Sequence, residues 1–218
     1  MITKKIVVGT PCVNDIPILS SACITKLCAT YPQNILPYFV SGSLVYDARQ
    51  DILNYALEEN ADYVMFIDSD IVFSIDAVEK LIEHDTDIVS GLYFGRRQFK
   101  NKPIAYDKIT PMRFGKAAKC ISITDIDTPY RAVDACGLGF CLIKMQAIKH
   151  ISKRYKLLFE PYRGLGEDFS FFYRAKKCGY KCYLDTTFEL GHVGTYVFTK
   201  HDYLRGLQNE GERDKEAI

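Results

Sequence analysis

The feature that most constrains this chain is a regular alternation, over residues 5–95, of short apolar runs with amphipathic segments. The run YVMFI at 63–67 is apolar at every position, which is typical of a central parallel strand buried on both faces. Other strands are expected within 4–11, 35–43 and 87–94, and helices within 16–31, 43–62 and 75–82. This order predicts an α/β fold with a mostly parallel central sheet and helices on both faces.

The second half of the chain is less regular. Short strands are expected at 121–126, 130–136 and 139–145, then a helix from 166, a further strand and a charged tail at 205–218 that frays. These short strands predict a smaller antiparallel part in the C-terminal half. With no repeat and no low-complexity linker, we expect a single domain over 1–218.

Composition excludes several classes of protein. The net charge is +1, with acids and bases mixed along the chain, which argues against a nucleic-acid-binding protein and against a polybasic membrane anchor but leaves open a local basic patch. No apolar stretch is long enough for stable membrane insertion and none resembles a signal peptide, so we expect a soluble, cytoplasmic protein. The eight cysteines contain no CxxC pair and are interpreted as reduced core thiols, with a zinc site at Cys178 and Cys182 as the alternative.

Two aspartates follow the most apolar strand. Asp68 and Asp70 flank Ser69 at the expected carboxyl end of this strand, which is where open parallel sheets bind ligands. Paired carboxylates suit Mg²⁺ or Mn²⁺, and an added imidazole would favour Mn²⁺. His192 lies between Gly191 and Gly194, which leave room for a ligand, although a lone histidine is more often a surface or core residue without a chemical role. Alternatively, one aspartate caps the next helix and the other is solvated.

A second pair of acids opens the helix expected from 166. Glu167 and Asp168 follow Gly166, and a helix N-terminus favours ionised carboxylates, so either could act as a base. The alternative is that both acids only stabilise the first turn of the helix.

Taken in order, the motifs GTP, DARQ, FIDSD, GLGF and GED and the later histidine resemble those of GT-A fold glycosyltransferases. They are similar in particular to the inverting family two and its small single-domain viral and bacterial relatives, over residues 5–195. The resemblance implies a metal-dependent enzyme that moves a hexose from a nucleotide sugar to a hydroxyl of a glycan, glycoprotein or other glycoconjugate, with inversion. A UDP-sugar such as UDP-glucose is the favoured donor and GDP-mannose is second. Residues 1–95 would form the nucleotide-binding half and 96–200 the acceptor half.

The resemblance also implies roles by position. The residues expected to bind the metal and donor are Thr10, Pro11, Arg49, Asp68, Ser69, Asp70, Gly137, Leu138, Gly139 and His192, with Asp68, Asp70 and His192 as ligands of Mn²⁺ or Mg²⁺. Asp168 would be the catalytic base, and Glu167 would hold the acceptor. Arg96, Arg97, Lys100 and Lys102 form a basic loop that could close over the diphosphate or simply be solvated. Four aromatic residues, Tyr93, Phe94, Phe140 and Tyr162, are candidates for stacking on a sugar.

The sequence departs from the family pattern in two respects, and two alternative functions stay open. Gln50 follows Arg49 where the family often has Asn, and the QxxRW motif of processive members is absent from a chain that has no Trp. A sugar-1-phosphate nucleotidyltransferase is the first alternative, but GTPCVND at 9–15 lacks the usual GxGxR loop. A non-catalytic nucleotide-sugar-binding module is the second, although the intact acids at 68, 70 and 168 argue against it.

Overall fold

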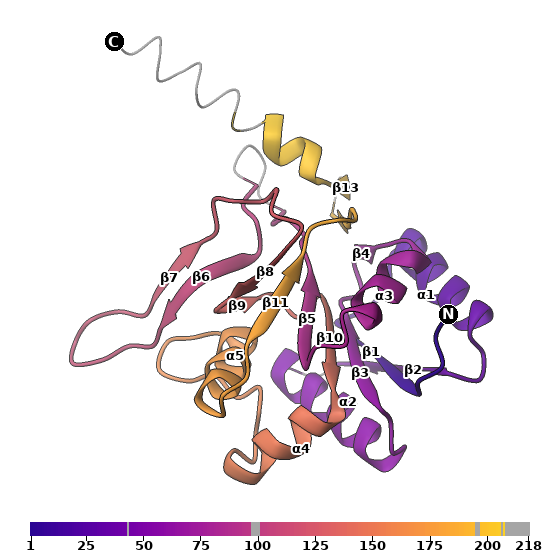
Figure 1. The fold of residues 1–218 in the computed structure, drawn as a ribbon, viewed down its shortest axis with the longest axis horizontal. Coiled ribbons are helices and arrows are strands. Elements are labelled where there is room, and N and C mark those ends of the chain that lie inside the picture. Colours follow the sequence, from indigo (N-terminus) through magenta and orange to yellow (C-terminus); the bar gives the residue numbers. More distant parts are fainter. Residues whose placement is uncertain (43, 97–100, 195–196, 206, 208–218) are drawn as a thin grey trace.

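A seven-stranded sheet, shared by both halves of the chain, organises the protein (Figure 1). The computed structural model describes residues 1–42, 44–96, 101–194, 197–205 and 207. The first half contains β1 (Ile6–Cys12), α1 (Ile18–Thr30), β2 (Ile35–Ser41), α2 (Val45–Glu58), β3 (Tyr63–Ile67), β4 (Ile71–Val72), α3 (Ile75–Glu83) and β5 (Ile88–Gly91). The strands and helices expected in this half are all present, which confirms the α/β prediction.

The second half contains more elements than expected. They are β6 (Ala105–Thr110), β7 (Lys119–Ser122), β8 (Tyr130–Val133), β9 (Ala135–Cys136), β10 (Phe140–Lys144), α4 (Met145–Arg154), α5 (Glu167–Lys177), β11 (Cys182–Asp185), β12 (Gly191–Val193) and β13 (Val197–Phe198). Strands β6, β12 and β13 and helix α4 have no counterpart in the expectations. The strand expected at 130–136 is two short strands, and the one expected at 121–126 begins and ends earlier.

The sheet order is β2-β1-β3-β10-β5-β11-β8. Strands β1, β2 and β3 are mutually parallel and β11 is parallel to β5, whereas β10 runs antiparallel between β3 and β5. β8 closes the far edge, antiparallel to β11. The sheet is therefore mostly parallel, as expected, but a strand of the second half separates two strands of the first. Two small antiparallel sheets, β13-β12-β4 and β7-β6-β9, flank it.

Helices cover both faces of the central sheet. One apolar core joins the sheet to α2, α4 and α5, through residues such as Ile52, Ile148 and Phe171. The other joins it to α1 and α3, through residues such as Leu27 and Leu81. Side chains along β3 alternate between the two cores, which explains why this strand is apolar at every position.

The cysteines are only partly the core thiols that were expected, because Cys136, Cys141 and Cys182 are buried whereas Cys120 is exposed and the other four are partly exposed. All eight cysteines are free thiols, and Cys182 is buried with its Sγ 3.5 Å from that of Cys136, whereas Cys178 is partly exposed. Within the described part of the chain, no helix is both long and apolar enough to cross a membrane.

Candidate active site

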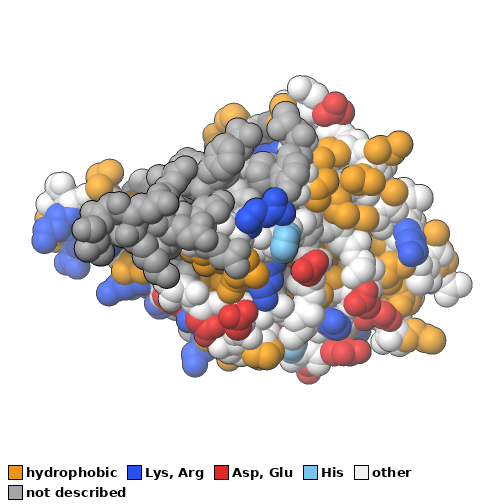
Figure 2. Space-filling view, turned by 90° about the horizontal axis from the view of Figure 1, so that it is seen from above, with side chains coloured by type: hydrophobic (Ala, Val, Ile, Leu, Met, Phe, Trp, Pro, Cys, Tyr) orange, Lys and Arg blue, Asp and Glu red, His pale blue; other side chains and the backbone are white. Residues whose placement is uncertain are grey.

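The candidate site lies at the carboxyl ends of the parallel strands. Seen from above in Figure 2, acidic, basic and histidine side chains lie close together near the middle of this face. Strand β3 ends at Ile67, and the turn of Asp68 and Asp70 leads directly into β4. The backbone N–H of Asp68 donates to the carbonyl of Gly139 at 2.9 Å, so this turn is fixed to the one that precedes β10.

Arg49, on α2, occupies the centre of the site. Its side chain is 3% exposed, and one of its amino groups donates to Asp68 Oδ1 at 2.8 Å. Its Nε lies 3.9 Å from Glu167 Oε1, and its other amino group donates to the Leu138 carbonyl at 3.5 Å. The guanidinium also lies over the ring of Phe66, 5.4 Å from the ring centroid. Arg49 therefore joins the aspartate turn, the glycine turn and the start of α5.

Asp70 lies between the guanidinium of Arg96 and the imidazole of His192. Its Oδ2 lies 2.8 Å from a guanidinium nitrogen of Arg96, and its Oδ1 lies 3.4 Å from Nε2 of His192. Burial alone would raise the pKa of Asp70, but the hydrogen bond and charge of His192, together with the charge of Arg96, lower it below its ordinary value. Asp70 is therefore a carboxylate at neutral pH.

The orientation of His192 suits a metal ligand. Its Nδ1 is 2.8 Å from the carbonyl of Phe94, which can only accept, so Nδ1 carries the proton. Without an ion, the hydrogen bond between Nε2 and Asp70 needs a proton on Nε2; in the neutral ring, Nε2 would instead offer its lone pair to an ion placed between the two side chains. Metal-binding histidines are commonly held by such a bond from the other ring nitrogen. A carboxylate oxygen of Asp70 and a ring nitrogen of His192 therefore face each other, and such a pair of metal ligands suits Mn²⁺.

The three side chains expected to bind metal do not form one cluster. Among the described residues, no group of three histidine, cysteine or acidic side chains is close enough together to hold an ion. Asp70 and His192 come together, whereas Asp68 is paired with Arg49.

Asp168 lies in the first turn of α5, partly buried beside Glu167. Burial and then the negative charge of Glu167 raise the pKa of Asp168 to about 7, against the hydrogen bond from the Phe169 N–H and the charge of Arg49. A carboxylate with a pKa near the working pH is well suited to accept a proton during a reaction.

The Tyr93 hydroxyl lies beside Gly137 and Gly139 and close to the carboxylates of Asp68 and Asp168. Its hydroxyl accepts a hydrogen bond from the N–H of Gly139 at 3.1 Å. Burial, and then the charges of Asp68 and Asp168, raise the pKa of Tyr93 well above its ordinary value, so the hydroxyl keeps its proton. A Cβ atom at Gly137 would lie 1.8 Å from this hydroxyl, so only glycine fits there. The sequence indicates Tyr93 only as one of four aromatic candidates for stacking on a sugar, and not as a partner of the glycine turn.

The remaining expected residues differ in accessibility. Thr10 and Leu138 are buried, and Pro11 is partly exposed at the end of β1. Phe94 and Phe140 belong to the core, whereas Tyr162 is partly exposed. Within the expected basic loop, Arg96 contacts Asp70, Lys102 is exposed, and Arg97 and Lys100 lie outside the described residues.

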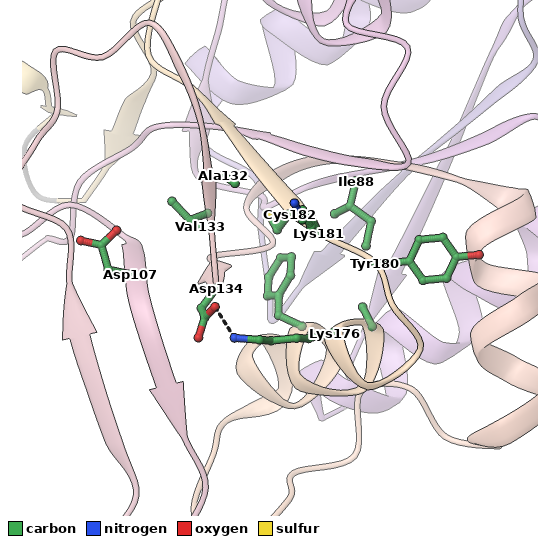
Figure 3. Close-up of a pocket in the computed structure, with 11 residues that line it drawn as sticks. Ile88, Asp107, Ala132, Val133, Asp134, Lys176, Tyr180, Lys181 and Cys182 are labelled. Atoms are coloured by element: carbon green, nitrogen blue, oxygen red, sulfur yellow. Dashed lines mark hydrogen bonds and ion pairs between the residues drawn. The ribbon is translucent and has the colours of Figure 1, made fainter.

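A separate cavity of about 280 Å³ lies between α5, β8 and β11 (Figure 3). Asp134 and Lys176 form an ion pair at its edge. None of the site residues expected from the sequence lines this cavity, so it does not belong to the site at the strand ends.

Comparison with known proteins supports the fold. No model of a known protein family matches the chain, and no curated protein matches it in sequence. The crystal structure of A197 from STIV aligns with a TM-score of 0.60 and 20% identity, over 87% of this chain and 86% of that chain. GalNAc-T7 with UDP, GalNAc and Mn²⁺ aligns with a TM-score of 0.56 and 12% identity, over 94% of this chain but only 48% of that chain.

A third structure, a glycosyltransferase involved in the glycosylation of the major capsid of PBCV-1, aligns with a TM-score of 0.37 and 11% identity. It covers 72% of this chain and 71% of that chain, and a TM-score this low does not establish a shared fold. The two stronger likenesses show the fold, which is the GT-A fold, and so confirm the fold expected from the ordered motifs.

Proposed function

We propose that the protein is a metal-dependent glycosyltransferase that moves a hexose from a nucleotide sugar to a hydroxyl of a glycan or glycoconjugate. The observation that carries this proposal is the meeting of the aspartate turn and the start of α5 on the two sides of Arg49. This brings a metal-binding type of turn next to a carboxylate whose pKa suits a base. GalNAc-T7, which shares the fold, was solved with UDP, GalNAc and Mn²⁺, which supports a nucleotide-sugar donor, and UDP is the favoured nucleotide.

Asp70 and His192 are the proposed protein ligands of Mn²⁺ or Mg²⁺. The ion would supply positive charge that neutralises the diphosphate as it leaves the sugar. Arg96 already provides a cation at Asp70, so it would have to leave this carboxylate and could then reach the diphosphate. Asp68 and Ser69 would complete the turn, with Asp68 orienting Arg49.

Asp168 is the proposed base. A carboxylate on the opposite face of the sugar can take the proton of the acceptor hydroxyl as the new bond forms, which inverts the anomeric carbon. Glu167, held near Arg49, would bind the acceptor. Pro11, which is partly exposed, would line the nucleoside pocket, and the neighbouring Thr10 would support it from the buried side. The turn of Gly137, Leu138 and Gly139 would lie near the transferred sugar.

Calorimetry with UDP, GDP and CDP, each with and without Mn²⁺, tests the donor half of the proposal. We expect one nucleotide to bind only when the metal is present. The Asp168→Asn variant should keep this binding and lose transfer, measured by mass spectrometry of candidate acceptors. If EDTA changes neither nucleotide affinity nor transfer, the proposal is wrong.

The same preparation discriminates the alternatives. A sugar-1-phosphate nucleotidyltransferase would release pyrophosphate from a nucleoside triphosphate and a sugar phosphate. A non-catalytic binding module would bind the nucleotide sugar and leave it intact, in the wild-type protein as in Asp168→Asn.

A further inference from the structure

Strands β6 and β7 form a hairpin that projects from the body of the protein (Figure 1). Its tip, residues 111–118, is almost entirely exposed. The N–H of Met112 donates to the carbonyl of Arg163 at 2.8 Å, which anchors the tip to the segment before α5. Phe114 and Gly115 both have positive φ angles, 47° and 75°, so the tip is a tight turn with a defined shape.

The hairpin is strongly basic in a chain that is nearly neutral. Residues 105–122 contain four cations and a single carboxylate, that of Asp107, which is paired with Arg131. The four cations are Lys108, Arg113, Lys116 and Lys119, and all are exposed. No ion pair found among the described residues joins any of the four to a carboxylate.

Apolar side chains are exposed on the same hairpin. Phe114 is 89% exposed at the tip, and Met112 and Ile121 are 47% and 42% exposed. Lys108 lies opposite Ile121 in the strand register, so basic and apolar groups alternate across one face. Removing the apolar side chains of this face from water would be favourable, whereas leaving them exposed contributes nothing to the stability of the fold.

The basic character continues from the hairpin onto the neighbouring segment and α5. A cavity of about 990 Å³ beside the hairpin is lined by Arg113, Phe114, Arg163 and Lys177, among others. The guanidinium of Arg163 lies over the ring of Tyr162, and the ammonium of Lys177 lies over that of Tyr173. In Figure 2, basic and apolar side chains lie together at the end of the molecule toward which the hairpin points.

We propose that this hairpin surface, made of Lys108, Met112, Arg113, Phe114, Lys116, Lys119, Ile121, Arg163 and Lys177, binds the surface of an anionic lipid membrane. The cations would contact the phosphate-containing headgroups, and Phe114 and Met112 would enter the boundary between headgroups and acyl chains. A nucleic acid or a soluble polyanion would use the cations but would leave the apolar tip exposed. This peripheral binding needs no membrane-spanning helix and is independent of the proposed sugar transfer.

Sedimentation of the full chain with vesicles tests the charge component. We expect binding to phosphatidylcholine vesicles that contain 30% phosphatidylserine (a chosen composition, roughly that of a strongly anionic leaflet), and little binding to pure phosphatidylcholine. The double variant Lys116→Glu/Lys119→Glu should bind at least about tenfold more weakly. The matched control, Lys26→Glu/Lys149→Glu, reverses two exposed charges on α1 and α4 and should bind as the wild type does. Equal binding by both double variants would overturn the proposal.

A tryptophan reporter tests the apolar component, because the chain contains no Trp. The fluorescence of Phe114→Trp should shift to the blue when anionic vesicles are added. That of Phe39→Trp, at a site 47% exposed on β2, should not shift. If Phe114→Trp gives no shift with vesicles while the protein binds heparin or DNA through the same lysines, the surface is a polyanion site and the membrane proposal is wrong.

Discussion

The guanidinium of Arg49 donates a 2.8 Å hydrogen bond to Asp68, so a buried cation of α2 is paired with the first acid after β3. The same side chain lies 3.9 Å from Glu167, at the start of α5. Because Arg49 is 3% exposed, removing either partner would leave charge in surroundings from which water is largely excluded.

The first prediction concerns this cation. Arg49→Lys keeps the positive charge but loses the planar fork that reaches Asp68, Glu167 and the Leu138 carbonyl together. We expect the free energy of unfolding to fall by about 1–3 kcal/mol, measured by urea denaturation. Arg154→Lys, at an exposed position of α4, is the matched control and should change stability by less than about 0.5 kcal/mol. Similar effects for the two variants would show that Arg49 has no special role.

The second prediction is the pH dependence of transfer. Asp168 must be deprotonated to accept a proton, so the rate should rise with pH and level off above a midpoint near 7. Glu167 raises the pKa of Asp168, so Glu167→Gln should move this midpoint to lower pH. A midpoint that stays in place in Glu167→Gln would mean that another group controls the rate.

The third prediction links Asp168 to stability. Its folded pKa of about 7 lies above its ordinary value of 3.8, so the folded state holds an extra proton between these pH values. Wild-type stability should therefore fall, relative to Asp168→Asn, as pH rises from about 4 to 7. The difference at pH 8 should be between about 1 and 4 kcal/mol, with Asp168→Asn the more stable. Thermal unfolding at pH 4.5 and 8 measures this difference. For Asp47→Asn, at an exposed site on α2, the stability difference from wild type should be the same at both pH values.

The fourth prediction concerns metal affinity, measured by electron paramagnetic resonance of Mn²⁺. Asp70→Asn and His192→Gln should each weaken binding by about tenfold or more, because each removes a proposed ligand. Arg96→Gln should strengthen it, since Arg96 holds the carboxylate of Asp70 at 2.8 Å and competes with the ion. Weaker binding in Arg96→Gln would contradict this competition, and Asp47→Asn again serves as the neutral control.

The fifth prediction tests the packing around Tyr93. Gly137→Ala would place a Cβ atom 1.8 Å from the Tyr93 hydroxyl and 2.8 Å from a methyl carbon of Ile104. We expect it to lower the free energy of unfolding by about 1–3 kcal/mol or more, through overpacking. Gly95→Ala meets its nearest atom at 3.4 Å and should be milder. Equal losses in a denaturation experiment would show that Tyr93 moves away easily.

The sequence predicts the first half of the fold well because each helix and strand there has a clear local pattern of apolar residues or a capping residue. Ala48, Ile52 and Ala56 follow the helical period and are buried in α2, and Ser74 is the N-cap of α3, although its side chain makes no capping hydrogen bond. By contrast, α4 follows β10 without a loop and without a typical capping residue, so it was missed. The alternation along β6 is weak, with only Ala105 and Ile109 buried, so this strand was missed too.

The site is less visible in the sequence because its contacts are distant along the chain. The motifs indicated Asp68, Asp70, Asp168 and His192 one by one, but no local pattern predicts that Arg49 lies between Asp68 and Glu167. The bond from His192 to the Phe94 carbonyl and the pairing of Arg96 with Asp70 likewise arise only when the segment after β5 meets β12 and the aspartate turn. The carboxylates and the meeting of Asp70 with His192 could be foreseen, but the arginine partners of Asp68 and Asp70 could not.

The position of β10 has a consequence for how the chain is made. β3 and β5 are both complete long before Phe140 leaves the ribosome, yet each needs β10 beside it. Until then, the nascent chain holds two apolar strands with unpaired edges, which is the state most prone to aggregation. Closing the sheet also requires bringing together segments far apart in sequence, which slows folding. Biosynthesis of this protein should therefore depend on chaperones until β10 and then β11 have been added on the two sides of β5.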